Sequence, residues 1–148
     1  MSTEVLRTLF VRDLKKLKIE IESYQVEANL WKVDKKITNP AGNLCLHLIG
    51  NLNTYLGATL GNSGYVRDRD AEFSMRNVPQ KELIQKIEAT IKVADLVLSE
   101  LTEEQVKGEY PMLVFAEKTS TEFFLIHLAM HLSYHLGQVN YHRRLLDN

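Results

Sequence analysis

The sequence contains a single cysteine, Cys45, among its 148 residues. One cysteine excludes an intramolecular disulfide framework and any zinc site built on several cysteines. The formal net charge is −1, so the chain lacks the basic excess that nucleic-acid-binding surfaces normally show. With three prolines and no low-complexity tract, the composition gives no sign of disorder. The N-terminal residues include no apolar signal-peptide core, so we expect a cytoplasmic protein.

Two long stretches, residues 37–66 and 123–142, lack aspartate, glutamate, lysine and arginine altogether. Each is long enough to span a bilayer. Their asparagines and histidines would be costly in hydrocarbon, so we expect no membrane association. The better interpretation is two helices buried on most sides, in a bundle or at an oligomer interface. Since charge is missing around nearly their whole circumference, we predict a homodimer.

Apolar residues at three- and four-residue spacing predict four long helices joined by connections of moderate length. Asn39-Pro40 is typical of an N-cap followed by proline at the first helical position. Capping-box patterns at residues 102–105 and 119–122 predict a short extra turn and the start of the last helix. No strand is expected, so we predict one all-α domain, residues 1–148, folded as a four-helix bundle. The expected helices cover about 3–29, 40–60, 79–101 and 119–146.

All five histidines lie in the two uncharged stretches. His131 and His135 are four residues apart, so on a helix they share a face and can converge on one metal ion. His127 and His142 lie on the same side, and His47 is the histidine that the other stretch can supply as a third ligand. Three imidazoles without an anionic ligand suit zinc or a similar late divalent metal such as nickel. The competing interpretation is a set of surface or hydrogen-bonded core histidines.

The segments that carry these histidines are similar to a known family. His131-Leu-Ser-Tyr-His135-Leu-Gly-Gln resembles the motif that closes the last helix in the DinB-like (YfiT-like) metalloenzyme superfamily. Residues 43–52, around His47, resemble the second-helix motif that supplies the first metal ligand of that family. Residues 67–73 resemble a loop motif of one uncharacterised branch, so the resemblance covers nearly the whole chain.

The resemblance implies an up-down-down-up four-helix bundle, often dimeric, with a divalent metal held by His47, His131 and His135. Characterised relatives include thiol-dependent transferases and an isomerase. The implied partner is therefore a small-molecule substrate, with a low-molecular-weight thiol as one class, and the implied activity is a metal-dependent transferase or hydrolase. The alternative is a non-enzymatic dimeric bundle with a structural or vacant site. His127 and His142 match no ligand of the family, and we expect a pocket or core residue and a structural residue, respectively.

Several neighbouring residues admit both a structural and a functional interpretation. Asn51, one turn from His47, either faces the metal pocket or is a buried amide that caps another helix. The cluster Arg67–Glu72 is most simply a solvated loop held by its own ion pairs. Alternatively, it guards the pocket mouth and recognises an anionic substrate. Gly137 is expected to allow close approach of a neighbouring helix, and Gln138 to form a hydrogen bond across the bundle.

Overall fold

The computed structural model describes residues 2–148, and its regular secondary structure there is helical. The prediction of an all-α chain is confirmed. The long helical segments are α1 (Thr3–Glu22), α2 (Ala41–Leu52) with its π-helical continuation η2 (Asn53–Ala58), α4 (Gln80–Glu100) and α6 (Thr121–Leu146). The short ones are the 3₁₀-helix η1 (Glu27–Trp31), α3 (Arg69–Ser74) and α5 (Glu103–Lys107).

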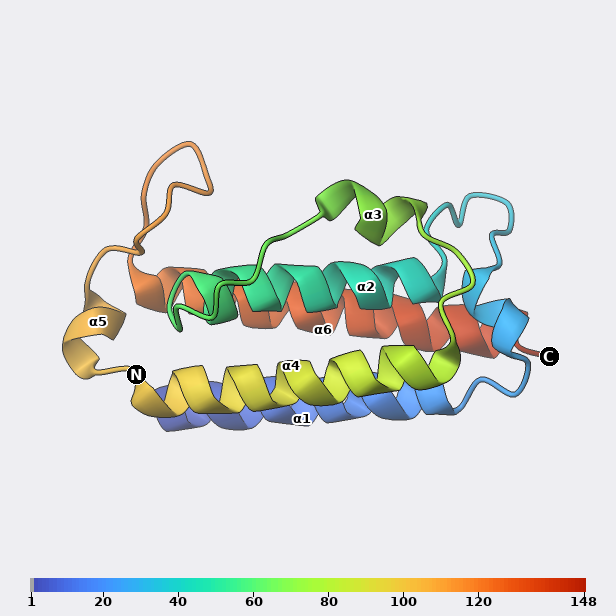
Figure 1. Cartoon of the computed structure of the whole chain (residues 1–148), viewed down its shortest axis with the longest axis horizontal. Helices are drawn as coiled ribbons and strands as arrows, with labels where there is room; N and C mark the ends of the chain where they lie inside the picture. The colour runs from blue at the N-terminus through green and yellow to red at the C-terminus, as the bar shows by residue number, and fades with distance from the viewer. Residues whose placement is uncertain (1) are drawn as a thin grey trace.

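The four long helices lie along one common axis (Figure 1). Followed by colour from blue to red, α1 and α6 run in one direction, and α2 and α4 run in the other. α1 packs mainly against α4 and α6, while α2 packs against α6, α4 and the short α3. Because α2 and α6 are antiparallel neighbours, later residues of α2 lie beside earlier residues of α6.

Several predicted helix ends differ from the structure because local hydrogen bonds decide them. The first helix ends at Glu22 instead of near residue 29, and the chain continues through a turn into η1. Asp147, near the C-terminus, holds that turn: its carboxylate accepts hydrogen bonds from the backbone N–H groups of Gln25 and Val26 at 2.7 and 3.1 Å. The C-terminal residues are thereby tied to the first connection.

The caps of the later helices were predicted to within one residue. Pro40 itself is the N-cap of α2, so the helix begins one residue later than the Asn39-Pro40 pattern predicted. The capping box at Thr102 is present as predicted. At the start of α6 the N-cap is Ser120, one residue after the predicted Thr119, and its hydroxyl accepts a hydrogen bond from the backbone N–H of Phe123.

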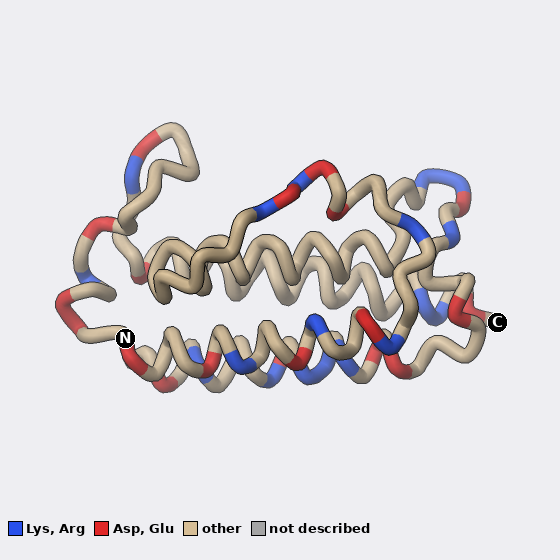
Figure 2. The backbone as a smooth tube through the Cα atoms, viewed as in Figure 1, with Lys and Arg blue, Asp and Glu red and all other residues tan. Residues whose placement is uncertain are grey.

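The two uncharged helices are buried to different extents. Figure 2 shows α2 in tan throughout and α6 in tan between its first and last turns, with the charged residues of the long helices concentrated on α1 and α4. Every residue of α2 is buried within this one chain, so α2 needs no second copy to cover it. α6 instead exposes a row of large apolar side chains: Phe123, Ile126, Met130, Tyr134, Tyr141 and Leu145. Within residues 2–148, the structure has no helix that is both long enough and apolar enough to cross a membrane.

The segment between η2 and α4 folds back over α2, where a solvated loop had been predicted. Its residues form α3, and Asp68 caps this helix by accepting a hydrogen bond from the Ala71 N–H. Asn43 of α2 donates hydrogen bonds to the carbonyl oxygens of Glu72 and Met75, at 2.9 and 2.8 Å. These bonds hold α3 against the part of α2 that precedes His47.

Candidate metal centre

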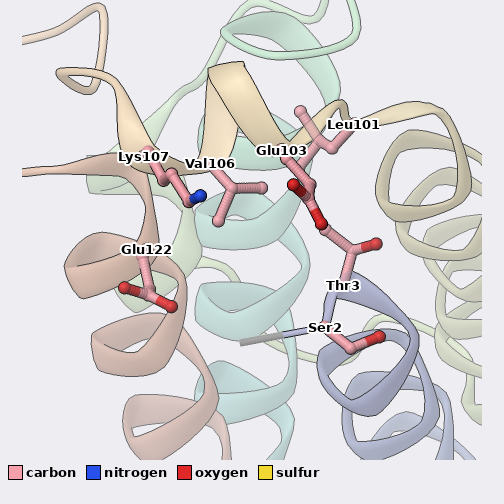
Figure 3. A pocket seen from close by; sticks show the side chains of 7 residues that line it. All are labelled: Ser2, Thr3, Leu101, Glu103, Val106, Lys107 and Glu122. Atoms are coloured by element: carbon pink, nitrogen blue, oxygen red, sulfur yellow. The ribbon is translucent and has the colours of Figure 1, made fainter.

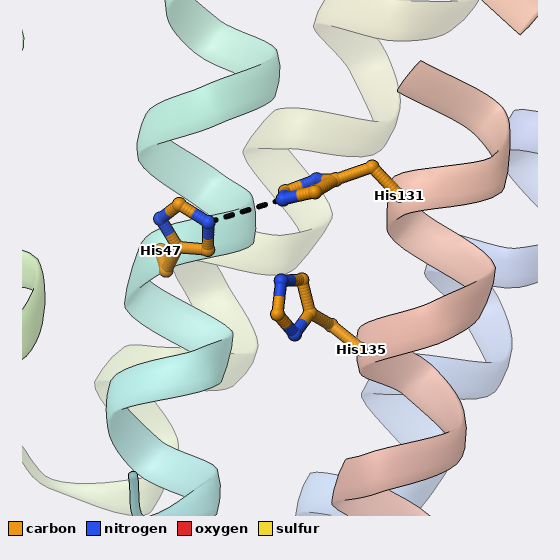
Figure 4. Close-up of side chains that lie close together, drawn as sticks. All are labelled: His47, His131 and His135. Atoms are coloured by element: carbon orange, nitrogen blue, oxygen red, sulfur yellow. Dashed lines mark hydrogen bonds between the residues drawn. The ribbon is translucent and has the colours of Figure 1, made fainter. Parts of the chain in front are cut away.

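Three histidine side chains meet between α2 and α6 (Figure 4). The Nε2 atoms of His47 and His131 are 3.2 Å apart. Each of His47, His131 and His135 offers a ring nitrogen, and these three atoms all lie within 4.8 Å of one another. The structure therefore brings together His131 and His135, which their spacing had paired, and His47, the histidine of the other uncharged stretch.

The cluster fits a small divalent ion. Tetrahedral zinc at about 2.0–2.1 Å from each nitrogen separates two ligand nitrogens by about 3.4 Å. The Nε2 atoms of His47 and His131 are already close to that separation. The three rings cross at 75–89° instead of stacking, and one nitrogen of each lies within 4.8 Å of the other two. Among residues 2–148, no Asp or Glu side chain contributes a ligand atom to this group.

Burial favours the neutral form of the two imidazoles that α6 contributes to the cluster, those of His131 and His135. Burial, reinforced by the neighbouring histidines, lowers the pKa of His131 to about 4. Burial also lowers the pKa of His135. A metal ion binds the neutral form of imidazole, so near pH 7 both residues are in the form that can act as ligands.

We call the ring nitrogen of a cluster histidine that does not face the cluster its outer nitrogen. The outer nitrogen of His47 is Nδ1, and a buried carboxylate holds it. This Nδ1 donates a hydrogen bond to Oε1 of Glu72 at 3.0 Å, and Glu72 is only 6% exposed. Arg67 donates two hydrogen bonds to the same carboxylate, from Nε to Oε2 at 2.8 Å and from Nη2 to Oε1 at 3.0 Å. Burial opposes ionisation of Glu72, but the hydrogen bonds from His47 and Arg67 outweigh it and lower the pKa of Glu72. A carboxylate bound to the outer nitrogen of a ligand histidine fixes its ring orientation and raises its basicity.

Glu72 corrects the predicted solvated cluster, since Glu72 is buried beside the histidine cluster and Arg67 is a partly buried partner of its carboxylate. Glu72 reaches His47 because residue 50 of α2 is a glycine. A Cβ at Gly50 would overlap Oε2 of Glu72 and lie 2.6 Å from its Cδ. The sequence offered one signal for the burial of Glu72: the oppositely charged Arg67 and Glu72 follow the long uncharged stretch 37–66.

His135 also has an outer partner. Its Nδ1 donates a hydrogen bond to Oε1 of Gln138 at 2.7 Å, one turn further along α6. The predicted hydrogen bond of Gln138 across the bundle is therefore wrong. The close helix approach predicted at Gly137 is also absent within the described part of the chain, since a Cβ there would meet nothing within 4 Å.

The remaining histidines lie outside the cluster. His127 is exposed rather than in the core, and its ring packs against Phe115 at a centroid distance of 4.8 Å. His142 is buried, with Nδ1 2.6 Å from the Tyr24 hydroxyl and Nε2 2.9 Å from the Lys32 carbonyl oxygen. The structural role predicted for His142 is confirmed.

The histidines of the cluster differ in exposure between the two helices. His47 is buried, whereas His131 and His135 are partly exposed. A separate hollow of about 400 Å³ lies where α5 meets the starts of α1 and α6 (Figure 3). Its lining contains no histidine, so it belongs to another part of the bundle: Ser2, Thr3, Leu101, Glu103, Val106, Lys107 and Glu122.

We expect the metal-free protein to lose stability as the pH falls from about 6.5 to about 4. Unfolded histidine takes up a proton near pH 6.5, whereas folded His131 does so at about 4. Between these values the unfolded state binds more protons, so acidification favours unfolding. His135 and His142, whose pKa values are also lowered, add to the effect.

Urea denaturation of chelator-treated protein, measured from pH 7.5 to 4.5, tests this expectation. The His131→Asn variant serves as the control, and its stability should depend less steeply on pH. A wild-type stability that stays constant from pH 6.5 to 4.5 would contradict the neutral burial of these rings.

Comparisons with known proteins identify a family for this chain but assign it no activity. No curated protein matches the chain. One family model matches residues 3–148, which is nearly the entire length, including both histidine-bearing helices and α3. The chain belongs to the family described as "Protein of unknown function (DUF1572)".

Proposed function

We propose that His47, His131 and His135 hold one divalent ion, zinc or nickel, and that the protein is a metal-dependent enzyme acting on a small molecule. The observation that carries this proposal is the convergence of three imidazoles from two antiparallel helices. Three protein ligands are typical of catalytic zinc sites, which keep one position open. An ion held by neutral ligands lowers the pKa of a bound water or thiol and so supplies a nucleophile near pH 7.

The chain's own residues prepare the site for this chemistry. Glu72 orients His47, and Arg67 balances the charge of Glu72. Gln138 orients His135. The partial exposure of His131 and His135 gives a substrate an approach from the α6 side. A low-molecular-weight thiol is the co-substrate class that we propose, with transfer or hydrolysis as the reaction.

We further propose that the fold is the up-down-down-up bundle of the DinB-like superfamily. Two features support this proposal. The four long helices run in the required directions in Figure 1. The segments that resemble the family's ligand motifs fall in α2 and α6.

A non-enzymatic bundle with a structural or vacant site is the second candidate. It is favoured by the direct contact between His47 and His131, whose Nε2 atoms come within hydrogen-bonding distance without an ion. In that case no external ligand would reach the centre. The two candidates therefore differ in whether a small molecule can bind beside the three histidines.

Cobalt substitution separates the two candidates, because cobalt gives such a site a visible spectrum. We expect a small thiol to produce a sulfur-to-cobalt charge-transfer band that is absent in His131→Ala. A spectrum that responds to carboxylates but not to thiols would favour hydrolysis over thiol transfer. A spectrum that no added ligand changes would contradict the enzyme proposal and favour the structural site.

We also propose that the protein is a homodimer formed through α6. All of the exposed apolar row on α6 except Leu145 lies in the uncharged segment 123–142, and such rows commonly mark interfaces. Gly137 lies between Tyr134 and Tyr141 on this helix, where its missing side chain would let a second copy approach.

Sedimentation velocity at micromolar concentration tests the dimer. The wild type should sediment as a dimer, and Tyr134→Glu should shift it towards monomer because a carboxylate would be buried in the interface. Leu96→Glu, which changes a similarly exposed side chain on α4, should leave the dimer intact. A wild-type monomer would contradict the proposal.

A further inference from the structure

The outer hydrogen bonds of the metal centre are complete for two histidines and incomplete for the third. Nδ1 of His47 is bound to Glu72, and Nδ1 of His135 is bound to Gln138. Nδ1 of His131 is buried and has no hydrogen-bond partner within the described residues. Ligand histidines almost always have such a partner, and an unpaired buried polar atom is costly.

One buried acceptor near the same centre is also unpaired. Asn51 is 7% exposed, and its Oδ1 has no partner among the described residues. Asn51 follows His47 by four residues, which places it about 6 Å further along α2 on nearly the same face. Because α6 runs antiparallel to α2, that displacement leads towards the His131 end of the cluster and away from His135.

We propose that Asn51 is the positioning residue for His131, its amide accepting a hydrogen bond from Nδ1 when Nε2 of His131 faces a metal ion. The inference rests on the metal site proposed above. It would give each of the three ligand histidines an outer partner: a carboxylate for His47, an amide for His135 and an amide for His131.

The proton positions explain why an amide suits this place. Glu72 accepts a hydrogen bond from Nδ1 of His47, so a neutral His47 carries no proton on Nε2. The 3.2 Å contact between the two Nε2 atoms then requires a proton on Nε2 of His131. A nitrogen that binds a metal ion must carry no proton. Ion binding at Nε2 of His131 would therefore move its proton to Nδ1. In the described structure Nδ1 of His131 has no partner, but the asparagine amide carries an oxygen that can accept a hydrogen bond from Nδ1 once the proton is there.

The other unpaired buried atoms fit this role less well. Nε1 of Trp31 is a donor only and cannot accept from His131. The hydroxyl of Thr54 lies in η2, seven residues after His47, and therefore about 10 Å further along the helix. Asn51 is the acceptor one turn from the cluster.

The test compares Asn51→Leu with Asn51→Asp. Zinc affinity would be measured by competition with a chelator at pH 7.5. The leucine variant removes the acceptor at similar volume and should bind zinc about 10–100-fold more weakly. The aspartate variant retains an acceptor and should bind within a few-fold of the wild type. Asn53→Leu is the control, because it removes an amide bound to Ile49 and Thr90 and should leave zinc affinity unchanged.

A spectroscopic signature makes the test independent of folding. In zinc-loaded wild type, nitrogen-15 NMR of the histidine rings should show a slowly exchanging Nδ1 proton on His131, and Asn51→Asp should preserve it. Tight zinc binding by wild type and Asn51→Leu alike would overturn the role of Asn51, as would a His131 ring without that proton. Failure of the wild type to bind zinc would instead overturn the proposed metal site itself.

Discussion

Replacing any one of His47, His131 or His135 with alanine is expected to abolish stoichiometric zinc binding. Each residue supplies one of three convergent nitrogens, and none of the described Cys, Asp or Glu side chains joins the group as a substitute ligand. Two imidazoles on their own form a site of much lower affinity, so the metal should be lost during purification. Elemental analysis of protein purified without a histidine tag, followed by equilibrium dialysis against zinc, measures the effect.

His127→Ala is the matched control for these three variants. It removes an imidazole from the same helix, one turn before His131, but from an exposed ring outside the cluster. Its metal content should equal that of the wild type. His142→Ala is a poorer control, because it removes a buried ring bound to Tyr24 and Lys32. Full metal content in any of the three ligand variants would show that the site is wrongly assigned.

The parts of the site that could be predicted from the sequence are those set by spacing along a helix. His131 and His135 converge because four residues make about one helical turn. His47 could be paired with them because it is the histidine of the other uncharged segment. The long helices followed from their apolar periodicity for the same reason, while their ends depended on individual hydrogen bonds such as those of Asp147.

What could not be predicted depends on what lies opposite each residue in space. His127 and His142 occupy the same side of α6 as the ligands, yet one is exposed and the other is buried against Tyr24. Helical spacing contains no information about the element that each ring meets. Glu72 was missed likewise, because burial of its charge requires Arg67, His47 and the glycine at position 50 together.

Gly50→Ala is expected to destabilise the protein, although alanine at a helix interior ordinarily stabilises by about 1 kcal/mol relative to glycine. The new Cβ would lie 2.6 Å from Cδ of Glu72. Glu72 cannot simply turn aside, because Arg67 and His47 hold both of its oxygens. Breaking a buried ion pair of this kind costs about 3–5 kcal/mol. We therefore expect a net loss of about 2–4 kcal/mol in chemical denaturation, together with a zinc affinity about 10–100-fold lower.

Two comparisons isolate the cause of this effect. Gly137→Ala, in the middle of α6, places its Cβ in open space within the protomer. In the Tyr134→Glu background, where the proposed dimer interface is broken, it should show the ordinary stabilisation. In a background of Glu72→Ala the obstructing side chain is gone, so adding Gly50→Ala should cost nothing further. This non-additivity is the signature of a direct clash. If Gly50→Ala destabilises the Glu72→Ala protein as much as the wild type, the glycine serves the backbone of α2, and its role in admitting Glu72 to the histidine cluster is wrong.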